Sequence, residues 1–155
     1  MPLTSIDHVQ LAAPPGSEAL LRAFYCGVLG MTEIPKPGAL ASRGGCWFMA
    51  GAVQLHLGIE ADFRPARKAH PGLRVRDISA YAERFSSRGV PVTWDDALPG
   101  HRRFYADDPV GNRLEFLEGE PLPLPEPLPE PEPEPESASQ PGWGSGPVSQ
   151  PLPPP

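Results

Sequence analysis

The sequence has few cysteines and no long hydrophobic run. Its 155 residues include two cysteines, Cys26 and Cys46, whose spacing fits no zinc motif, so we expect two free thiols rather than a disulfide. No apolar run approaches the roughly 18 residues that a membrane-spanning helix needs. The first residues, MPLTSIDHV, lack the basic start and apolar run of a signal peptide. These absences predict a cytoplasmic protein that does not associate with membranes.

The chain also lacks an excess of basic charge. Residues 1–118 contain all 13 Lys and Arg and 13 of the 19 Asp and Glu, so this part is formally neutral. The net charge of −6 comes from six glutamates nearer the C-terminus. No basic stripe with interleaved aromatic residues occurs, which argues against nucleic acid as a partner.

Proline is concentrated at the C-terminal end. Of the 24 prolines, 14 follow Glu118, many of them in the stretch PLPLPEPLPEPEPEPE. Such a segment buries too little apolar surface to offset its ordering entropy, and alternating Pro and Glu favour an extended polyproline II chain. We therefore expect one folded domain at residues 1–118 and a disordered Pro-rich tail at residues 119–155.

The folded part shows one order of elements twice. Residues 6–11 are predicted as a strand, and Ser17 is predicted to cap a helix that ends at Gly30. The buried face of that helix is predicted to consist of Leu21, Phe24, Tyr25 and Val28. Strands are predicted next at residues 32–34, 45–50 and 53–58.

After a polar linker the same order begins again. A strand is predicted at residues 71–75, and a helix that Asp77 caps and Gly89 ends is predicted after it. Strands follow at residues 90–94, 102–106 and 113–118, the last entered by a DPVGN turn. The order β-α-β-β-β thus occurs in modules at about residues 4–60 and 68–118. We expect an α+β domain in which the two modules enclose a cleft.

Each module places polar side chains at matching points. His8 and Gln54 are 46 residues apart, and His70 and Glu115 are 45 apart, so each first strand begins with a histidine and each last strand carries a polar residue. Strand side chains alternate between faces. Gln54 and His56 therefore share one face of their strand, and Glu115 lies opposite its apolar neighbours.

Four stretches of the sequence are similar to the vicinal oxygen chelate superfamily, which includes glyoxalases, bleomycin resistance proteins and extradiol dioxygenases. They are IDHVQL, RAFYCGVLGM, HPGLRVRDI and YADDPVGNRLEFLE, and the similarity spans residues 4–118. The resemblance implies two βαβββ modules that form a curved mixed sheet around a metal or ligand cleft.

The resemblance also implies a metal site. The first and last strands of each module supply ligands in this family, which assigns His8, His70 and Glu115 here and makes Gln54 the symmetry equivalent of Glu115. Two imidazoles and a carboxylate suit one divalent Fe, Mn, Ni, Zn or Co ion. Family members with four ligands often have Glu where this chain has the neutral Gln54, and His56 lies out of register in this comparison. We assign both to the substrate pocket.

Further pocket residues are open to two interpretations. Arg103 and Tyr105 would suit an anionic or enolate-bearing substrate, but they also fit a solvated turn with strand-facing aromatic residues. Trp47, Phe48 and Trp94 fit either an apolar pocket wall or the core.

Two classes of function follow from the resemblance. The first is a divalent-metal-dependent enzyme of lyase, isomerase or dioxygenase type, with Glu115 as its catalytic residue and a small oxygen-chelating substrate. The second is a metal-free protein that binds and sequesters an antibiotic. Because both histidines and the glutamate are present, the enzyme is favoured. We also expect a homodimer, with the cleft completed either within one chain or between two.

Overall fold

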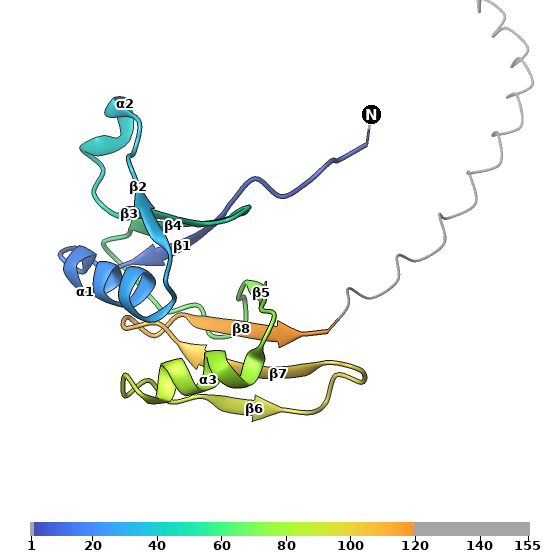
Figure 1. The fold of residues 1–155 in the computed structure, drawn as a ribbon. Helices are drawn as coiled ribbons and strands as arrows, with labels where there is room; N and C mark the ends of the chain where they lie inside the picture. Colours follow the sequence, from blue (N-terminus) through green and yellow to red (C-terminus); the bar gives the residue numbers. More distant parts are fainter. Residues whose placement is uncertain (1, 120–155) are drawn as a thin grey trace, which may run out of the picture. The chain divides into compact units, whose positions relative to one another are not determined.

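The computed structural model describes residues 2–119 as two mixed sheets of four strands with helices against them (Figure 1). The tail predicted at residues 119–155 lies outside the described residues except for Gly119. The first module contains β1 (Val9–Ala13), α1 (Glu18–Arg22), the π-helical segment η1 (Ala23–Val28), β2 (Thr32–Ile34), α2 (Gly38–Ala41), β3 (Cys46–Ala50) and β4 (Val53–Ile59). The second contains β5 (Gly72–Arg74), α3 (Ile78–Ser86), β6 (Thr93–Asp95), β7 (Arg102–Asp107) and β8 (Arg113–Glu118). The predicted repeat of βαβββ modules is confirmed.

Both sheets have the same strand order. The first is β1-β4-β3-β2 and the second is β5-β8-β7-β6. The pairs β1–β4 and β5–β8 are parallel, and all other strand pairs are antiparallel. In each module the first strand therefore lies directly beside the last. This pairing brings the residues at the start of the first strand close to the polar face of the last.

The two helix starts differ from each other. The Asp77 side chain accepts a hydrogen bond from the Ala80 N–H at 2.9 Å, as predicted for a cap. Ser17 is the N-cap residue of α1 as predicted, but the predicted capping bond is absent, and its hydroxyl donates to the Pro14 carbonyl at 2.7 Å. The backbone of Ser17 is helical (φ −87°, ψ −4°) rather than extended as a capping residue's usually is.

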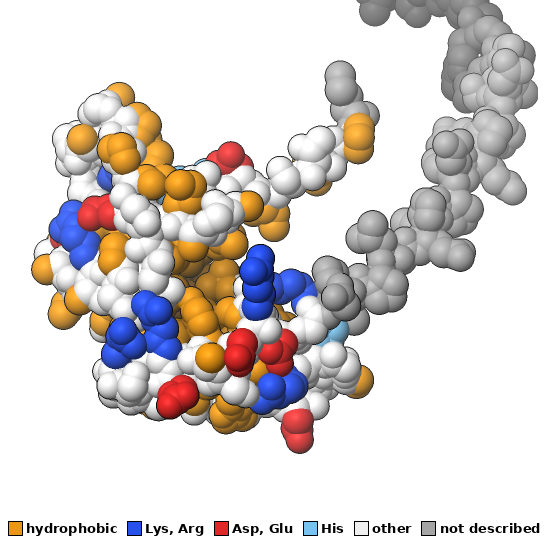
Figure 2. Space-filling view, viewed as in Figure 1, with side chains coloured by type: hydrophobic (Ala, Val, Ile, Leu, Met, Phe, Trp, Pro, Cys, Tyr) orange, Lys and Arg blue, Asp and Glu red, His pale blue; other side chains and the backbone are white. Residues whose placement is uncertain are grey.

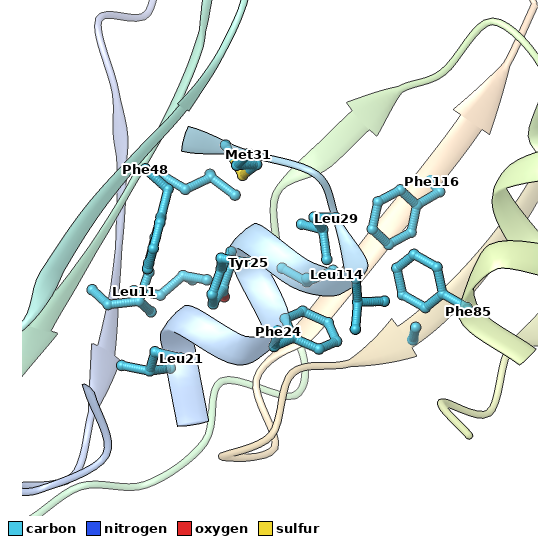
Figure 3. Packing of buried hydrophobic residues seen from close by; sticks show 14 of the residues in the cluster. Leu11, Leu21, Phe24, Tyr25, Leu29, Met31, Phe48, Phe85, Leu114 and Phe116 are labelled. Carbon is cyan, nitrogen blue, oxygen red and sulfur yellow. The ribbon is translucent and has the colours of Figure 1, made fainter. Parts of the chain in front are cut away.

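One hydrophobic core joins the two modules. All four predicted stripe residues of the first helix are buried, and Phe24 packs edge-to-face on Phe85 of α3 with ring centroids 6.0 Å apart. Figure 3 shows Phe24 and Leu29 between the first module's core and Phe85, Leu114 and Phe116 of the second. Neither module therefore buries its apolar face alone.

A buried polar network ties the modules together at the DPVGN turn. The Asn112 side chain, which is fully buried, donates to the Ala12 carbonyl at 2.9 Å and to Asp108 at 3.0 Å. It also accepts from the Ala66 N–H at 3.0 Å, and Tyr25 donates its hydroxyl to Asp108 at 3.0 Å. Strand β1, helix η1 and the linker are thereby fixed to the turn before β8.

The N-terminal residues form an arm rather than a strand. The predicted start of the first strand at residue 6 is wrong, because β1 begins at Val9, where its pairing with Leu55 begins. Leu3 and Ile6 are both exposed on this arm, which stands off the folded body (Figure 2). His8 is the last residue of the arm.

The visible face of the described residues carries acidic and basic side chains intermixed (Figure 2). No helix among residues 2–119 is long and apolar enough to span a bilayer.

Candidate metal centre

His70 and Glu115 lie side by side at the parallel β5–β8 pair. His70 Nε2 is 3.3 Å from Glu115 Oε2, and both side chains are largely buried. His70 Nδ1 is 2.8 Å from the Lys68 carbonyl oxygen, which can only accept, so Nδ1 carries a hydrogen and donates it. The neutral ring would then point the lone pair of Nε2 at a carboxylate. A metal ion bound by both Nε2 and Oε2 would stabilise this arrangement.

Gly72 lies beside this pair. It is paired with Glu115 in the sheet, and a Cβ at that position would lie 3.4 Å from Glu115 Oε2 and 3.3 Å from Leu117 Cδ1. Because glycine has no side chain, it adds no contact of its own to Oε2. An imidazole and a carboxylate are donors that suit a divalent ion.

Arg103 on β7 is engaged by two carboxylates. Its Nη1 donates to Glu115 Oε1 at 2.8 Å, while Nε and Nη2 donate to Asp95 Oδ1 at 3.1 and 2.8 Å. The Ala97 N–H and then the Arg103 guanidinium lower the pKa of Asp95, which stays ionised. The guanidinium therefore faces carboxylates of this chain, where the sequence predicted a substrate anion.

Tyr105 completes this cluster. It is paired with Glu115 across β7–β8, and the rings of Tyr105 and His70 meet at 86° with centroids 5.5 Å apart. Burial and then the Glu115 carboxylate raise the pKa of Tyr105, so its hydroxyl remains a hydrogen-bond donor at neutral pH.

A second cluster lies on the first sheet. The His56 ring is stacked between His8 and Trp47, with centroids 4.1 and 3.9 Å away. His56 is 4% exposed, and its Nε2 has no hydrogen-bond partner. Burial and then the neighbouring His8 lower the pKa of His56, so it keeps a free lone pair at neutral pH. His8 Nδ1 pairs with Asp7 at 2.8 Å, which leaves His8 Nε2 available as well.

Strand pairing makes His56 the equivalent of Glu115. Gln10, which is two residues after His8, pairs with His56. Gly72, which is two residues after His70, pairs in the same way with Glu115. The prediction that Gln54 holds this position is therefore wrong, and it is His56 that is in register.

A cavity of about 410 Å³ brings parts of the two modules together. His8, Gln54 and His70 line it, with Asp7 at its edge. Within residues 2–119, however, no three His, Cys, Asp or Glu side chains are close enough together to hold a metal ion. The structure thus gathers His70, Glu115, Arg103 and Tyr105 in one cluster, and His8, His56 and Trp47 in another.

Trp94 belongs to neither cluster. It is half exposed and contacts Phe104 and Arg102.

Three residues of the site were missed from the sequence. Asp7 and the Lys68 carbonyl orient the two histidines, and Asp95 anchors Arg103. Asp95 pairs directly with Arg103 between β6 and β7, so opposite charges in neighbouring strands were the available signal. The predicted strand ended at residue 94 and excluded it.

Sequence comparison decides the family. The pattern of the Glyoxalase family, described as the glyoxalase/bleomycin resistance protein/dioxygenase superfamily, matches residues 5–116. The chain belongs to this superfamily. A comparison with curated protein sequences gives no match.

Several solved structures share the fold. The crystal structure of a putative glyoxalase family protein from Bacillus anthracis is 47% identical, with a TM-score of 0.75 over 77% of this chain and 98% of that one. The antibiotic-binding protein TnmS3 from Streptomyces sp. CB03234 is 21% identical, with a TM-score of 0.61 over 77% and 99%. The E126Q mutant of the fosfomycin resistance protein FosX from Listeria monocytogenes, complexed with Mn(II) and a dihydroxypropylphosphonic acid, is 16% identical, with a TM-score of 0.64 over 77% and 95%. Proteins with this fold therefore include a metal-binding protein and an antibiotic-binding protein.

Proposed function

We propose that this protein is a divalent-metal-dependent enzyme that acts on a small substrate with two neighbouring oxygen atoms. His8, His70 and Glu115 would hold one Fe, Mn, Ni, Zn or Co ion, with His56 stacked on His8 in the position of the first module that is equivalent to Glu115. The observation that carries the proposal is His70, whose two ring nitrogens both face acceptors. A metal ion at Nε2 resolves this conflict and uses Glu115 Oε2 as a second ligand.

The bound ion would act as a Lewis acid that stabilises negative charge on the substrate's oxygens. Around it, the protonated Tyr105 hydroxyl can donate to a substrate oxygen, and Gln54 lines the same cavity as both ligand histidines. Arg103 holds Oε1 of Glu115, so Oε2 would be the atom that binds the ion or, when not bound to it, accepts a proton from the substrate. These features of the site suit lyase, isomerase and dioxygenase chemistry alike.

A second copy of the chain would complete the site in this proposal. His8 and the His70–Glu115 pair are not gathered into one ligand set within residues 2–119. Strands β1 and β5 each form the edge of their sheet, and the arm before β1 carries exposed Leu3 and Ile6. A homodimer that covers these edges would bring the His8 of one copy to the Glu115 of the other.

Metal content tests the proposal. The full chain, purified without chelator or metal-affinity resin, is analysed by inductively coupled plasma mass spectrometry beside His70→Ala and His101→Ala. We expect about one Fe, Mn, Ni, Zn or Co ion per chain in the wild type and in His101→Ala, and a loss of most of it in His70→Ala. The His101 variant controls for the general loss of an imidazole. Absence of metal from the wild type, with no uptake of added ions, would rule the proposal out.

A metal-free binding protein is the second candidate. Arg103 already engages Glu115 Oε1, and His8, which stacks on His56 and is 42% exposed, offers an aromatic ring to a flat ligand. The antibiotic-binding relative TnmS3 makes this class relevant. If the wild type binds no metal, quenching of tryptophan fluorescence by flat aromatic antibiotics, reduced in Trp47→Leu, would support this candidate.

A further inference from the structure

We infer that Arg103, anchored by Asp95, is a positioning residue that aims Glu115 at the metal, rather than a group that binds the substrate. This inference rests on the proposed metal-dependent function. It concerns the side chains that hold Glu115 in place rather than Glu115 itself.

The three side chains span three adjacent strands. Asp95 on β6 pairs in register with Arg103 on β7, and Glu115 lies on the neighbouring strand β8. Arg103 uses its Nε and Nη2 edge for Asp95 and its Nη1 for Glu115, so the planar guanidinium is held at both ends. Side-chain exposure is only 17% for Arg103 and 12% for Glu115.

This arrangement distinguishes the two oxygens of Glu115. Oε1 accepts from Arg103 at 2.8 Å, while Oε2 is 3.3 Å from His70 Nε2 and faces the Cα of Gly72, which has no side chain. The carboxylate cannot rotate without losing a charge-assisted hydrogen bond. Oε2 is thereby fixed as the metal-facing atom before any ion arrives.

Charge alone would predict that Arg103 weakens metal binding. A guanidinium next to a ligand carboxylate repels an approaching cation, so removing it should tighten metal binding. Asp95 compensates for this, because one guanidinium between two carboxylates leaves a net charge of −1. We therefore expect orientation to outweigh repulsion, and the sign of the effect can be measured.

The test is Mn(II) binding to the full-length apoprotein, measured from the electron paramagnetic resonance signal of the Mn(II) that stays free. Absorption spectra of the Co(II)-loaded protein are recorded in parallel. The variants are Arg103→Gln, Arg103→Lys and Asp95→Asn. The matched control is Arg102→Gln, which removes the neighbouring cation of the same strand, one that pairs with Glu118 and Ser79 instead. Thermal unfolding of each apoprotein checks that it is folded.

We expect Arg103→Gln to raise the Kd for Mn(II) roughly 10- to 100-fold, the usual effect of losing a residue that orients a ligand. Asp95→Asn should weaken binding in the same direction. Arg103→Lys should not restore it, because an ammonium group cannot bridge both carboxylates with fixed geometry. The altered Glu115 geometry should also change the Co(II) spectrum, which a merely structural role would leave unchanged, and Arg102→Gln should match the wild type.

Each other outcome overturns the inference in a recognisable way. If the wild type binds metal and Arg103→Gln binds it equally well, the positioning role is wrong while the proposed function stands. Tighter binding by Arg103→Gln means that Arg103 competes with the metal for Glu115. A wild type that takes up neither ion overturns the proposed function and this inference together.

Discussion

At the scale of the residue, Tyr25 shows how burial links the fold to pH. It is fully buried, stacks on Phe48 with centroids 4.9 Å apart, and donates its hydroxyl to Asp108. Burial and then the Asp108 carboxylate raise the pKa of Tyr25 well above its usual value. An unfolded chain releases this proton near pH 10, whereas the folded chain retains it. The free energy of unfolding should therefore fall as the pH rises above about 10.

The substitution Tyr25→Phe separates the hydrogen bond from the titration. At pH 7 we expect the free energy of unfolding to fall by about 1–2 kcal/mol, because the buried Asp108 loses one donor. Above about pH 10 the variant should lose stability less steeply than the wild type, since it has one tyrosine fewer that ionises only on unfolding. Urea unfolding at pH 7, 9 and 10.5 measures both effects. Equal slopes for the two proteins between pH 9 and 10.5 would contradict the assignment.

Single residues of the site could be predicted only in part. His8 and His70 begin two similar segments, and the resemblance to the superfamily assigned them as ligands. The network that orients them was not predictable, because the Lys68 carbonyl is a backbone group and Asp95 acts through Arg103. Such partners are defined by strand pairing, which a single sequence does not show.

At the scale of the element, the turn into β3 depends on Gly45. Its φ is +79°, and an added Cβ would overlap the Leu57 carbonyl of the paired strand β4. Gly51, in the hairpin between the same strands, has a φ of +58° but open space around its Cβ position. The two glycines thus share a left-handed backbone and differ in steric room.

This difference makes a matched pair of variants. Gly45→Ala should reduce the free energy of unfolding by about 3 kcal/mol, because backbone strain is added to a clash that forces β3 and β4 apart. Gly51→Ala should cost only about 1 kcal/mol, from strain alone. Urea unfolding followed by far-ultraviolet circular dichroism compares them. Similar losses in the two variants would show that the Leu57 contact does not matter.

Elements with a clear pattern were predicted well. The strands Thr32–Ile34 and Arg113–Glu118 have their predicted bounds, as apolar alternation and turn residues define both ends. The short helix Gly38–Ala41 was missed, because four residues without a side-chain cap give no periodic signal.

The register error has a similar cause. His8 and His56 are 48 residues apart, whereas His70 and Glu115 are 45 apart. The extra residues lie before β3, because 39 positions separate His8 from Trp47, the partner of His56, and 35 separate His70 from Tyr105, the partner of Glu115. Equal sequence separations therefore do not mark equivalent positions.

At the scale of the whole molecule, the candidate ligands are divided between the modules. His8 and His56 belong to the first sheet, and His70 and Glu115 to the second. The shared core and the Asn112 network hold the modules together through their buried sides. A site built by two copies would combine the first module of one chain with the second module of the other.

This arrangement predicts complementation between two inactive variants. His8→Ala and His70→Ala, each expressed alone, should lose most of the bound metal. In a heterodimer of the two, purified through a different tag on each chain, one site contains both substitutions and the other contains neither. We therefore expect about one metal ion per heterodimer, measured by mass spectrometry, against almost none in either homodimer. A metal-free heterodimer would place the ligands within one chain, and failure of the two chains to co-purify would contradict the dimer.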